Sequence, residues 1–359
     1  MALRTVLDVF KGDAFSTTAL DTMISTAPFV PSMLGGMGLF ANEPLPPYTT
    51  TVQVYAEDGI VSLVPTTKRG APDVQAKRAS GKLYAFEPPR LSVKDSVHSW
   101  ELPGYAGSFN EAQATRTAVA LLDRRAEVLK SNLEATKEYH RLGALGGRLL
   151  DADGTTVIYD YAAEFGIAAP AAVNIAFGTI AEGDLMPFIM TNFTMPMQKA
   201  LKNRWVPGST RLGALCGEQF WLKLLSHPGV RKAYDIQMNN RSVTLAANPN
   251  ANPPMYESVV FGGVEWRYYA ASYGGDVGTS IGIAANQARF FPINAQDVFK
   301  VYWAPGETFQ QIAEEGKPDY LMIQWDPREE LASHVDVFAR SYPLYFCRTP
   351  EALMTGRAV

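Results

Sequence analysis

The chain has 359 residues, of which 47% are hydrophobic and 19% are charged, a composition typical of a folded protein with two or three domains. The formal net charge of −4 excludes the excess of lysine and arginine by which proteins wrap around DNA. Two cysteines without a C-x-x-C pair favour packed thiols over a disulfide framework or a zinc site, and no run of about 20 apolar residues offers a membrane span.

Residues 1–47 are rich in proline and glycine, which prevent a long helix or a central strand. The same stretch holds more large apolar side chains than a disordered tail normally carries. They include Phe10, Phe15, Phe29, Met33, Leu34, Leu39 and Phe40. Together, these properties predict an extended arm that lies on a neighbouring molecule.

Residues 48–86 have the pattern of a long hairpin with a charged tip. Val52, Val54 and Ala56 alternate with other residue types, and strand character resumes at residues 83–86. The basic residues between the two strands are Lys68, Arg69, Lys77, Arg78 and Lys82. Because an isolated two-stranded ribbon is only marginally stable in water, we expect this one to lean on another molecule.

A long polar helix is predicted over residues 110–142. Ser108 and Glu111 have the spacing of a capping box, in which two side chains satisfy backbone N–H groups at a helix start. Gly143 and the Gly146-Gly147 pair are predicted to stop the helix.

The apolar stripe of this helix is narrow. It consists of Ala118, Leu122, Ala126, Leu129 and Leu133. Lys130 and Glu134 are expected to form an ion pair on the solvent side. A rod of roughly 45–50 Å with so little apolar surface must lie across its own domain or across neighbouring subunits.

Shorter elements follow the long helix. A hairpin is predicted around the Asp153-Gly154 turn, and helices are predicted at residues 196–204 and 218–225. Strands are predicted at residues 258–261, 264–269, 288–292, 320–325, 334–339 and 344–347. Residues 163–190 are small and apolar without a clear period, so this stretch is left unassigned.

The sequence offers no catalytic constellation. Its four histidines, His98, His140, His227 and His334, are far apart, and no phosphate-binding loop of the G-x-G-x-x-G or P-loop spacing is present. We therefore predict no enzyme activity, no catalytic residue, no cofactor and no metal site. A hydrolase with a dispersed triad stays open as an alternative, because triads do not follow sequence order and residues 209–299 have an α/β texture.

The order of the elements is an arm, a hairpin, a long helix, a short hairpin, an α/β insertion and closing strands. This order resembles the major capsid proteins of tailed bacteriophages, of the type represented by the lambda major head protein. The clearest local marks are the long helix with Gly146-Gly147, the strand at residues 157–160, and the motifs Asp326-Pro327-Arg328-Glu329, Ser341-Tyr342-Pro343-Leu344 and Pro350-Glu351. The resemblance implies an α+β protein with the Hong Kong 97-like phage capsid fold.

The resemblance also divides the chain into parts. It implies an N-terminal arm at residues 1–47, an extended loop at residues 48–97 and an axial domain at residues 209–299. The peripheral domain is expected to combine residues 98–208, which contain the spine helix 110–142, with the strands of residues 300–359.

The implied function is that of a major capsid protein. Copies of it would self-assemble as hexamers and pentamers into an icosahedral head that encloses double-stranded DNA without sequence-specific binding. Implied partners are other copies of the chain, a scaffolding protein, a portal protein and, where the particle has one, a decoration protein. We expect assembly in the host cytoplasm, a final location in the virion capsid and no membrane contact.

Contacts between subunits are expected at the arm and at the hairpin tip. The expected residues are Phe29, Phe40, Lys68, Arg69, Lys77 and Arg78. One alternative of the same fold is the shell protein of a cellular compartment that encloses an enzyme cargo instead of a genome.

Overall fold

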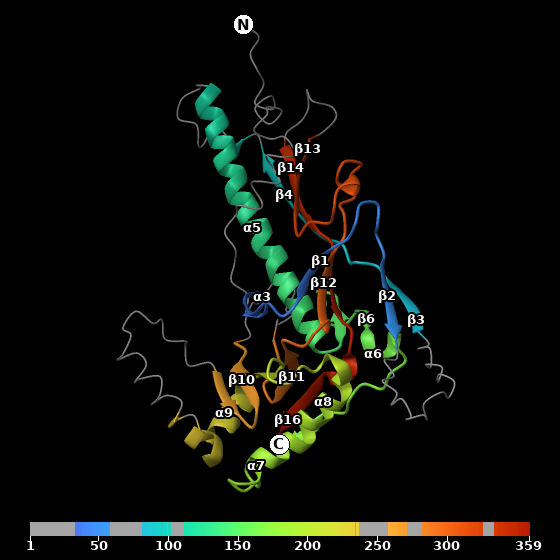
Figure 1. The fold of residues 1–359 in the computed structure, drawn as a ribbon. Helices are drawn as coiled ribbons and strands as arrows, with labels where there is room; N and C mark the ends of the chain where they lie inside the picture. The colour runs from blue at the N-terminus through green and yellow to red at the C-terminus, as the bar shows by residue number, and fades with distance from the viewer. Residues whose placement is uncertain are drawn as a thin grey trace, which may run out of the picture.

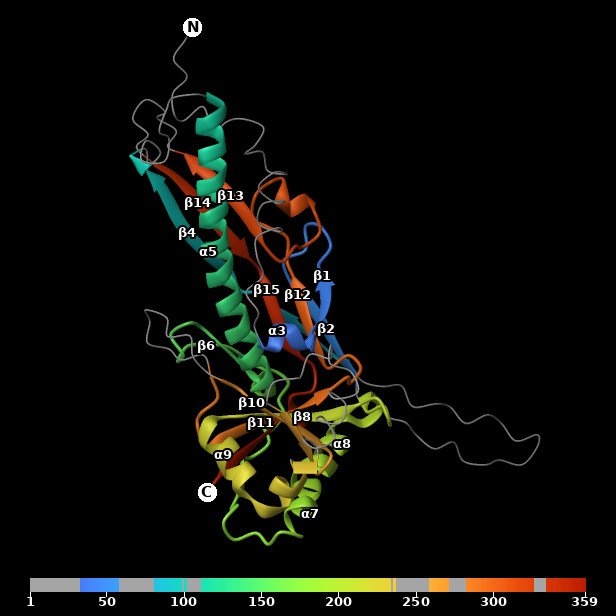
Figure 2. The same cartoon turned by 90° about the vertical axis from the view of Figure 1, so that its left-hand side faces the viewer.

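The computed structural model describes residues 33–57, 81–98, 100–101, 111–233, 235–236, 258–270, 282–325 and 334–359. The molecule is elongated, and α5 (Glu111–Leu145) runs along much of its length (Figure 1). The C-terminal end of α5 reaches a six-stranded sheet at one end of the molecule, and smaller sheets flank the rest of the helix (Figures 1 and 2). This mixture of helix and sheet is the predicted α+β class.

One antiparallel sheet packs on the N-terminal half of α5. Its strand order is β13 (Tyr320–Trp325), β14 (His334–Ser341) and β4 (Leu91–His98). The buried residues between the sheet and the helix are Val97, Leu121, Leu122, Ala126, Leu129, Leu133, Leu321, Val335, Val337 and Ala339. The predicted apolar stripe is therefore confirmed from Leu122 to Leu133, and it faces the subunit's own sheet. β4 falls within the range predicted for the extended loop, yet it pairs along its whole length with β14.

The long helix ends later than predicted. Gly143 lies inside α5, so the prediction that it stops the helix is wrong. Gly143 is needed for close packing, because a Cβ atom there would stand 2.6 Å from the backbone oxygen of Arg148. The helix ends at the Gly146-Gly147 pair, where the Gly147 N–H donates to Ala144 O (3.1 Å) and Gly147 adopts φ +78°. Ser108 and Asn110 lie outside the described residues.

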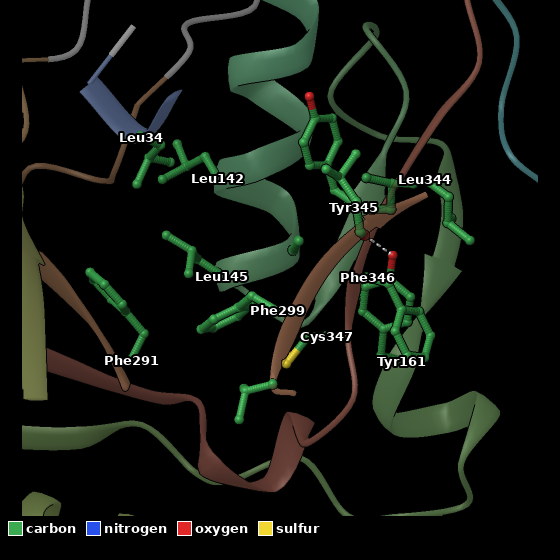
Figure 3. Packing of buried hydrophobic residues seen from close by; sticks show 14 of the residues in the cluster. Leu34, Leu142, Leu145, Tyr161, Phe291, Phe299, Leu344, Tyr345, Phe346 and Cys347 are labelled. Atoms are coloured by element: carbon green, nitrogen blue, oxygen red, sulfur yellow. Dashed lines mark hydrogen bonds between the residues drawn. The ribbon is translucent and has the colours of Figure 1, made fainter. Parts of the chain in front are cut away.

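A second sheet lies beside the middle of the molecule. It consists of β1 (Ala41–Pro44), β12 (Phe299–Trp303) and β15 (Pro343–Cys347), and the short helix α3 (Met33–Met37) precedes it. β1 occupies an edge, which is where a strand ending in Pro44 can be accommodated. In Figure 3, side chains of α3, α5, β12 and β15 gather in one buried cluster, and Tyr161 Oη donates to Tyr345 O.

The six-stranded sheet draws on three separate stretches of sequence. Its strand order is β7 (Val173–Ile175), β16 (Met354–Ala358), β11 (Gln287–Ile293), β8 (Arg211–Cys216), β10 (Val264–Tyr268) and β9 (Ser258–Phe261). The helices around it are α7 (Leu185–Ile189), the π-helix η2 (Met190–Thr194), α8 (Met195–Leu201) and α9 (Glu218–Ser226). The rings of Phe193 and Phe290 stack at 4.0 Å within the core of this region.

The described residues also include two hairpins and three short 3-10 turns. The hairpins are β2 (Val52–Glu57) with β3 (Gly81–Phe86), and β5 (Arg148–Leu150) with β6 (Val157–Asp160), which leads into α6 (Tyr161–Glu164). The turns are η3 (Lys202–Arg204), η4 (Gln311–Ala313) and η6 (Pro350–Ala352). Both hairpins, the helices α8 and α9, and the strands β9, β10, β11, β13, β14 and β15 are confirmed predictions.

Candidate functional site

The ribbon formed by β2 and β3 is anchored to its own subunit by one face. Phe86 is buried, and its ring lies 5.1 to 6.3 Å from the rings of Tyr159, Tyr161, Phe165 and Phe346, edge to face. The Tyr159 hydroxyl also donates to the Glu87 carbonyl at 2.9 Å. These contacts fix the direction in which the ribbon leaves the body of the subunit.

The opposite face of the ribbon is open. Tyr55 and Leu83 are cross-strand partners, and both are exposed, Leu83 by 62%. Arg348 holds the ribbon from the side, since its Nη2 donates to Tyr55 O at 2.8 Å while its Nη1 pairs with Asp297. The ribbon thus presents an apolar cross-strand pair on a base that is fixed in position. The predicted tip contacts Lys68, Arg69, Lys77 and Arg78 lie outside the described residues.

The described part of the predicted arm packs on its own subunit, whereas the sequence predicted contact with a neighbour. Leu34 is buried, and the ring of Phe40 lies 5.3 Å from those of Phe299 and Tyr345. Glu43 pairs with Lys300 at 3.0 Å, and β1 forms a parallel ladder with β12. The apolar side chains of residues 33–45 therefore find their cover within the subunit. The other predicted arm contact, Phe29, lies outside the described residues.

The C-terminal half of α5 carries a buried network of charges. Lys137 is only 1% exposed, and its Nζ lies 3.0 Å from Glu134 Oε1 and 2.6 Å from Asp319 Oδ1. Arg141 lies 3.5 Å from Glu134 Oε2 and 3.3 Å from Glu138 Oε2. Sequence reasoning missed this network, although one signal was present: Lys137 and Arg141 follow Leu133 at four-residue spacing, so they continue the apolar stripe.

The predicted solvent-side pair of Lys130 and Glu134 is wrong. Both residues are buried, and Glu134 pairs with Lys137 and Arg141 instead. The physical reason at Glu134 is that it faces the segment with α3 and β1 across a cleft, so its carboxylate is satisfied by neighbouring cations and not by bulk water.

A cleft of about 250 Å³ lies where this segment meets α5. Its lining combines aromatic rings with members of the charge network, and includes Leu34, Phe40, Lys137, Arg141, Trp303 and Tyr345. Cations face rings here, with Lys137 Nζ 5.4 Å from the Trp303 ring centre. The Tyr345 hydroxyl is buried without a hydrogen-bond partner among the described residues.

The two thiols are placed as packing groups. Cys216 and Cys347 are both buried, and burial raises the pKa of the Cys347 thiol to about 12 and that of Cys216 well above its usual value. A thiol held in its protonated form is a poor nucleophile. Neither cysteine therefore has the environment of a catalytic thiolate.

The four histidines occupy three different places. His227 is the C-terminal cap of α9, and its Nε2 lies 3.1 Å from Ile180 O. His140 is buried on α5, where burial lowers its pKa to about 4. His98 and His334 are cross-strand partners with rings 5.7 Å apart, and His334 Nε2 lies 3.7 Å from Asp336 Oδ1.

Across the described ranges, no three side chains of the His, Cys, Asp and Glu types are grouped so that they could bind a metal ion. Within the same ranges, no helix combines the length and the apolar character needed to span a bilayer.

Several large apolar side chains stand uncovered on the surface. Phe309 is fully exposed, and Trp100 and Tyr48 are 73% and 72% exposed. Tyr48 is fixed beside the loop that carries Phe309, since its N–H donates to Ile312 O at 2.8 Å. Exposed aromatic side chains on loops with fixed backbones are typical of surfaces that bind other proteins.

The fold defines a class of protein. A long helix that runs past flanking sheets to a separate six-stranded sheet, with a ribbon extending from the body, is the architecture of a Hong Kong 97-like capsid subunit. The crystal structure of a protein assigned as the capsid protein of a prophage of E. coli CFT073 has this fold. The two structures align with a TM-score of 0.55 at 11% sequence identity, over 96% of this chain and 99% of that one.

The sequence places the chain in a family within that class. The family model for phage major capsid protein E matches residues 16–358, and the chain belongs to this family. The major capsid protein of Pseudomonas phage KPP10 is 22% identical over 352 residues, which cover 96% of this chain and 97% of that protein. The major capsid protein of Salmonella phage Felix O1 (isolate Felix O1-VT1) is 21% identical over 362 residues, covering 93% and 94%.

The predicted resemblance is thereby confirmed: the chain is a major capsid protein of a tailed bacteriophage, a structural subunit located in the capsid of the virion. The family match favours a phage head over the shell of a cellular compartment.

Proposed function

We propose that copies of this chain associate as hexamers and pentamers and close into an icosahedral head around double-stranded DNA. The observation that carries this proposal is the ribbon of β2 and β3. One of its faces is fixed to the subunit by Phe86, and the other presents Tyr55 and Leu83 without cover from the described residues. A ribbon built in this way is suited to lie across an adjacent copy.

The assignment of residue ranges to the parts of the subunit is also a proposal. The arm comprises residues 1–47 and the extended loop residues 48–97, with β4 serving the peripheral domain because it pairs with β14. The peripheral domain combines residues 98–208 with residues 300–359, and the axial domain comprises residues 209–299. β7 and β16 are counted with the axial sheet, because they pair there.

Further partners are proposed from the demands of building a closed shell around a genome. They are a scaffolding protein, a portal protein and, where the particle has one, a decoration protein, with assembly in the host cytoplasm. The net charge of −4 supports a shell that contains DNA without binding particular sequences. The protonated, buried thiols support a role without catalysis.

Deleting residues 66–80 tests the proposal directly. The deletion stops before Gly81 because Gly81 pairs with Glu57 in the ribbon. We expect the shortened protein to keep its circular dichroism spectrum but to form no closed particles in electron micrographs when it is produced with its scaffolding protein. A control with the same residues replaced by glycine and serine separates the loss of side chains from the loss of length. Normal heads from the deletion variant contradict the proposal.

A further inference from the structure

Glu138 lies where three parts of the subunit meet. Its carboxylate is 2% exposed and belongs to α5. One oxygen, Oε1, accepts the N–H of Leu34 at 2.8 Å and the hydroxyl of Tyr269 at 3.3 Å. The other oxygen, Oε2, lies 3.3 Å from Nη1 of Arg141. A single buried carboxylate therefore joins the arm, the spine helix and the segment that follows β10.

The two donors belong to elements that are far apart in the sequence and join different sheets. Leu34 is in α3, which is followed by β1 on the edge of the middle sheet. Tyr269 follows β10, and its N–H donates to Cys216 O at 3.0 Å, so it moves with the axial sheet. Both residues are buried, which makes the hydrogen bonds costly to lose and slow to exchange with water.

The cover over α5 at this place is incompletely packed. The segment of residues 33–44, here called the arm segment, borders the cleft of about 250 Å³ together with Lys137 and Tyr345. Because a cleft already exists beneath it, displacing the arm segment breaks fewer van der Waals contacts than displacing a close-packed element. Polar contacts such as that of Leu34 with Glu138 therefore carry a larger share of what holds the arm segment down.

We propose that Glu138 is a positioning residue that couples the docking of the arm segment to the placement of the axial sheet. When Tyr269 donates to Oε1, the carboxylate is oriented toward the Leu34 N–H as well, and Arg141 holds it from the opposite side. A shift of the axial sheet along α5 withdraws the Tyr269 hydroxyl, and the carboxylate then loses one of the contacts that orient it for Leu34. The arm segment is released more easily as a result. Coupling of this kind transmits a rearrangement of the axial end of a subunit to its arm.

Hydrogen exchange at the Leu34 amide tests the coupling, because that amide is the donor in question. In Tyr269→Phe, which removes only a hydroxyl group, we expect exchange at Leu34 to accelerate about fivefold or more. Tyr345→Phe is the matched control: Tyr345 lines the cleft beside Leu34, and its buried hydroxyl has no hydrogen-bond partner among the described residues, so exchange at Leu34 should not change. Unchanged exchange at Leu34 in Tyr269→Phe, accompanied by faster exchange at residues 264–269, overturns the proposal.

A second comparison uses Glu138 itself. Once Glu138→Ala has removed the shared acceptor, adding Tyr269→Phe should accelerate exchange at Leu34 no further. Additive effects of the two substitutions show independent contacts and overturn the coupling. If Glu138→Ala does not fold, the comparison of Tyr269→Phe with Tyr345→Phe still tests the coupling. Exchange is measured on the purified chain in whatever assembly state it adopts, so this outcome is independent of whether hexamers and pentamers form.

Discussion

Lys137 is a charged residue that continues the apolar stripe of α5 and is buried, a position where an apolar side chain is usually found. Its ammonium group is satisfied by Glu134 and Asp319, and its side chain lies against the ring of Trp303. Replacing all members of such a buried network by apolar residues is often tolerated. Replacing only one member leaves the opposite charge buried without compensation.

Lys137→Ala is therefore expected to destabilise the subunit by about 3–5 kcal/mol, because Asp319, only 11% exposed, loses its cation and the buried Glu134 keeps only Arg141. Lys317→Ala is the control, since the 2.6 Å pair of Lys317 with Glu314 is largely exposed and worth at most about 1 kcal/mol. Urea titration of dissociated subunits measures both free energies of unfolding. Equal losses in the two variants would contradict the burial argument.

His140 makes stability depend on pH. Burial lowers its pKa to about 4, so the folded state favours the neutral imidazole and the unfolded chain takes up the proton first. The contribution to stability is complete above the ordinary histidine pKa of about 6.5 and is lost as the pH falls toward 4, a difference of about 3 kcal/mol. In His140→Leu, the decrease in unfolding free energy between pH 6.5 and pH 4 should be smaller by this amount. An unchanged pH profile would rule out His140 as its source.

Among the elements, the ribbon has one face that supports the subunit, at Phe86, and an opposite face that is exposed, at Leu83. Phe86→Ala should cost about 3–5 kcal/mol of unfolding free energy, because it removes a ring that touches four others. Leu83→Ala, at an exposed position, should leave unfolding unchanged and should reduce the yield of closed particles if the outer face contacts another copy. Chemical unfolding and particle counts by electron microscopy separate these effects.

The junction of α5 with β5 depends on the small size of Gly143. Alanine at this site gains up to about 1 kcal/mol of helix propensity, but its Cβ would stand 2.6 Å from a backbone oxygen, which cannot move aside as a side chain can. We expect Gly143→Ala to lower the melting temperature, as measured by calorimetry. A higher melting temperature would show that the gain in helix propensity outweighs the steric clash of the alanine Cβ.

The elements with strong periodicity were predictable. The apolar stripe from Leu122 to Leu133 predicted α5, and β-branched or alternating runs of residues predicted β2, β10 and β14. β7 and β16 were missed because short strands with residues such as Gly356 and Arg357 have little signal of their own and are formed by pairing with distant partners. The segment with α3 and β1 was predicted to be an extended arm. Its prolines and glycines interrupt the periodic pattern of apolar residues by which a buried helix or strand is recognised.

The candidate site was less predictable than the fold. Charged residues on a helix are usually solvated, so nothing in Glu134, Lys137 or Glu138 alone indicates that another segment covers them. Only their register with the apolar stripe gives that information. Phe40 packs on Phe299 and Tyr345 of its own subunit, which the sequence alone did not indicate, because a sequence shows that a side chain needs cover but not which residues supply it.

At the scale of the whole molecule, the buried side chains of the described residues form three clusters that follow one another along α5 and into the axial sheet. The middle cluster joins the other two and includes residues from α3, α5, β12 and β15. Sequence-distant strands hold this arrangement together, above all β16 between β7 and β11.

Deletion of residues 354–359 should therefore abolish the folded axial sheet, because it leaves β7 and β11 without their shared neighbour. Limited proteolysis should then cleave residues 211–293 much faster than in the intact chain. Val359→Ala is the control, as that side chain is 64% exposed and its N–H bond to Ile175 O is retained. Equal protease resistance in the deletion variant would show that β16 is dispensable.

The interior place of β16 has a consequence for biosynthesis. A ribosome must have made more than 350 residues before the strand that completes the six-stranded sheet leaves the exit tunnel. A chain that stops before residue 354 has no strand to place between β7 and β11, so its six-stranded sheet stays incomplete.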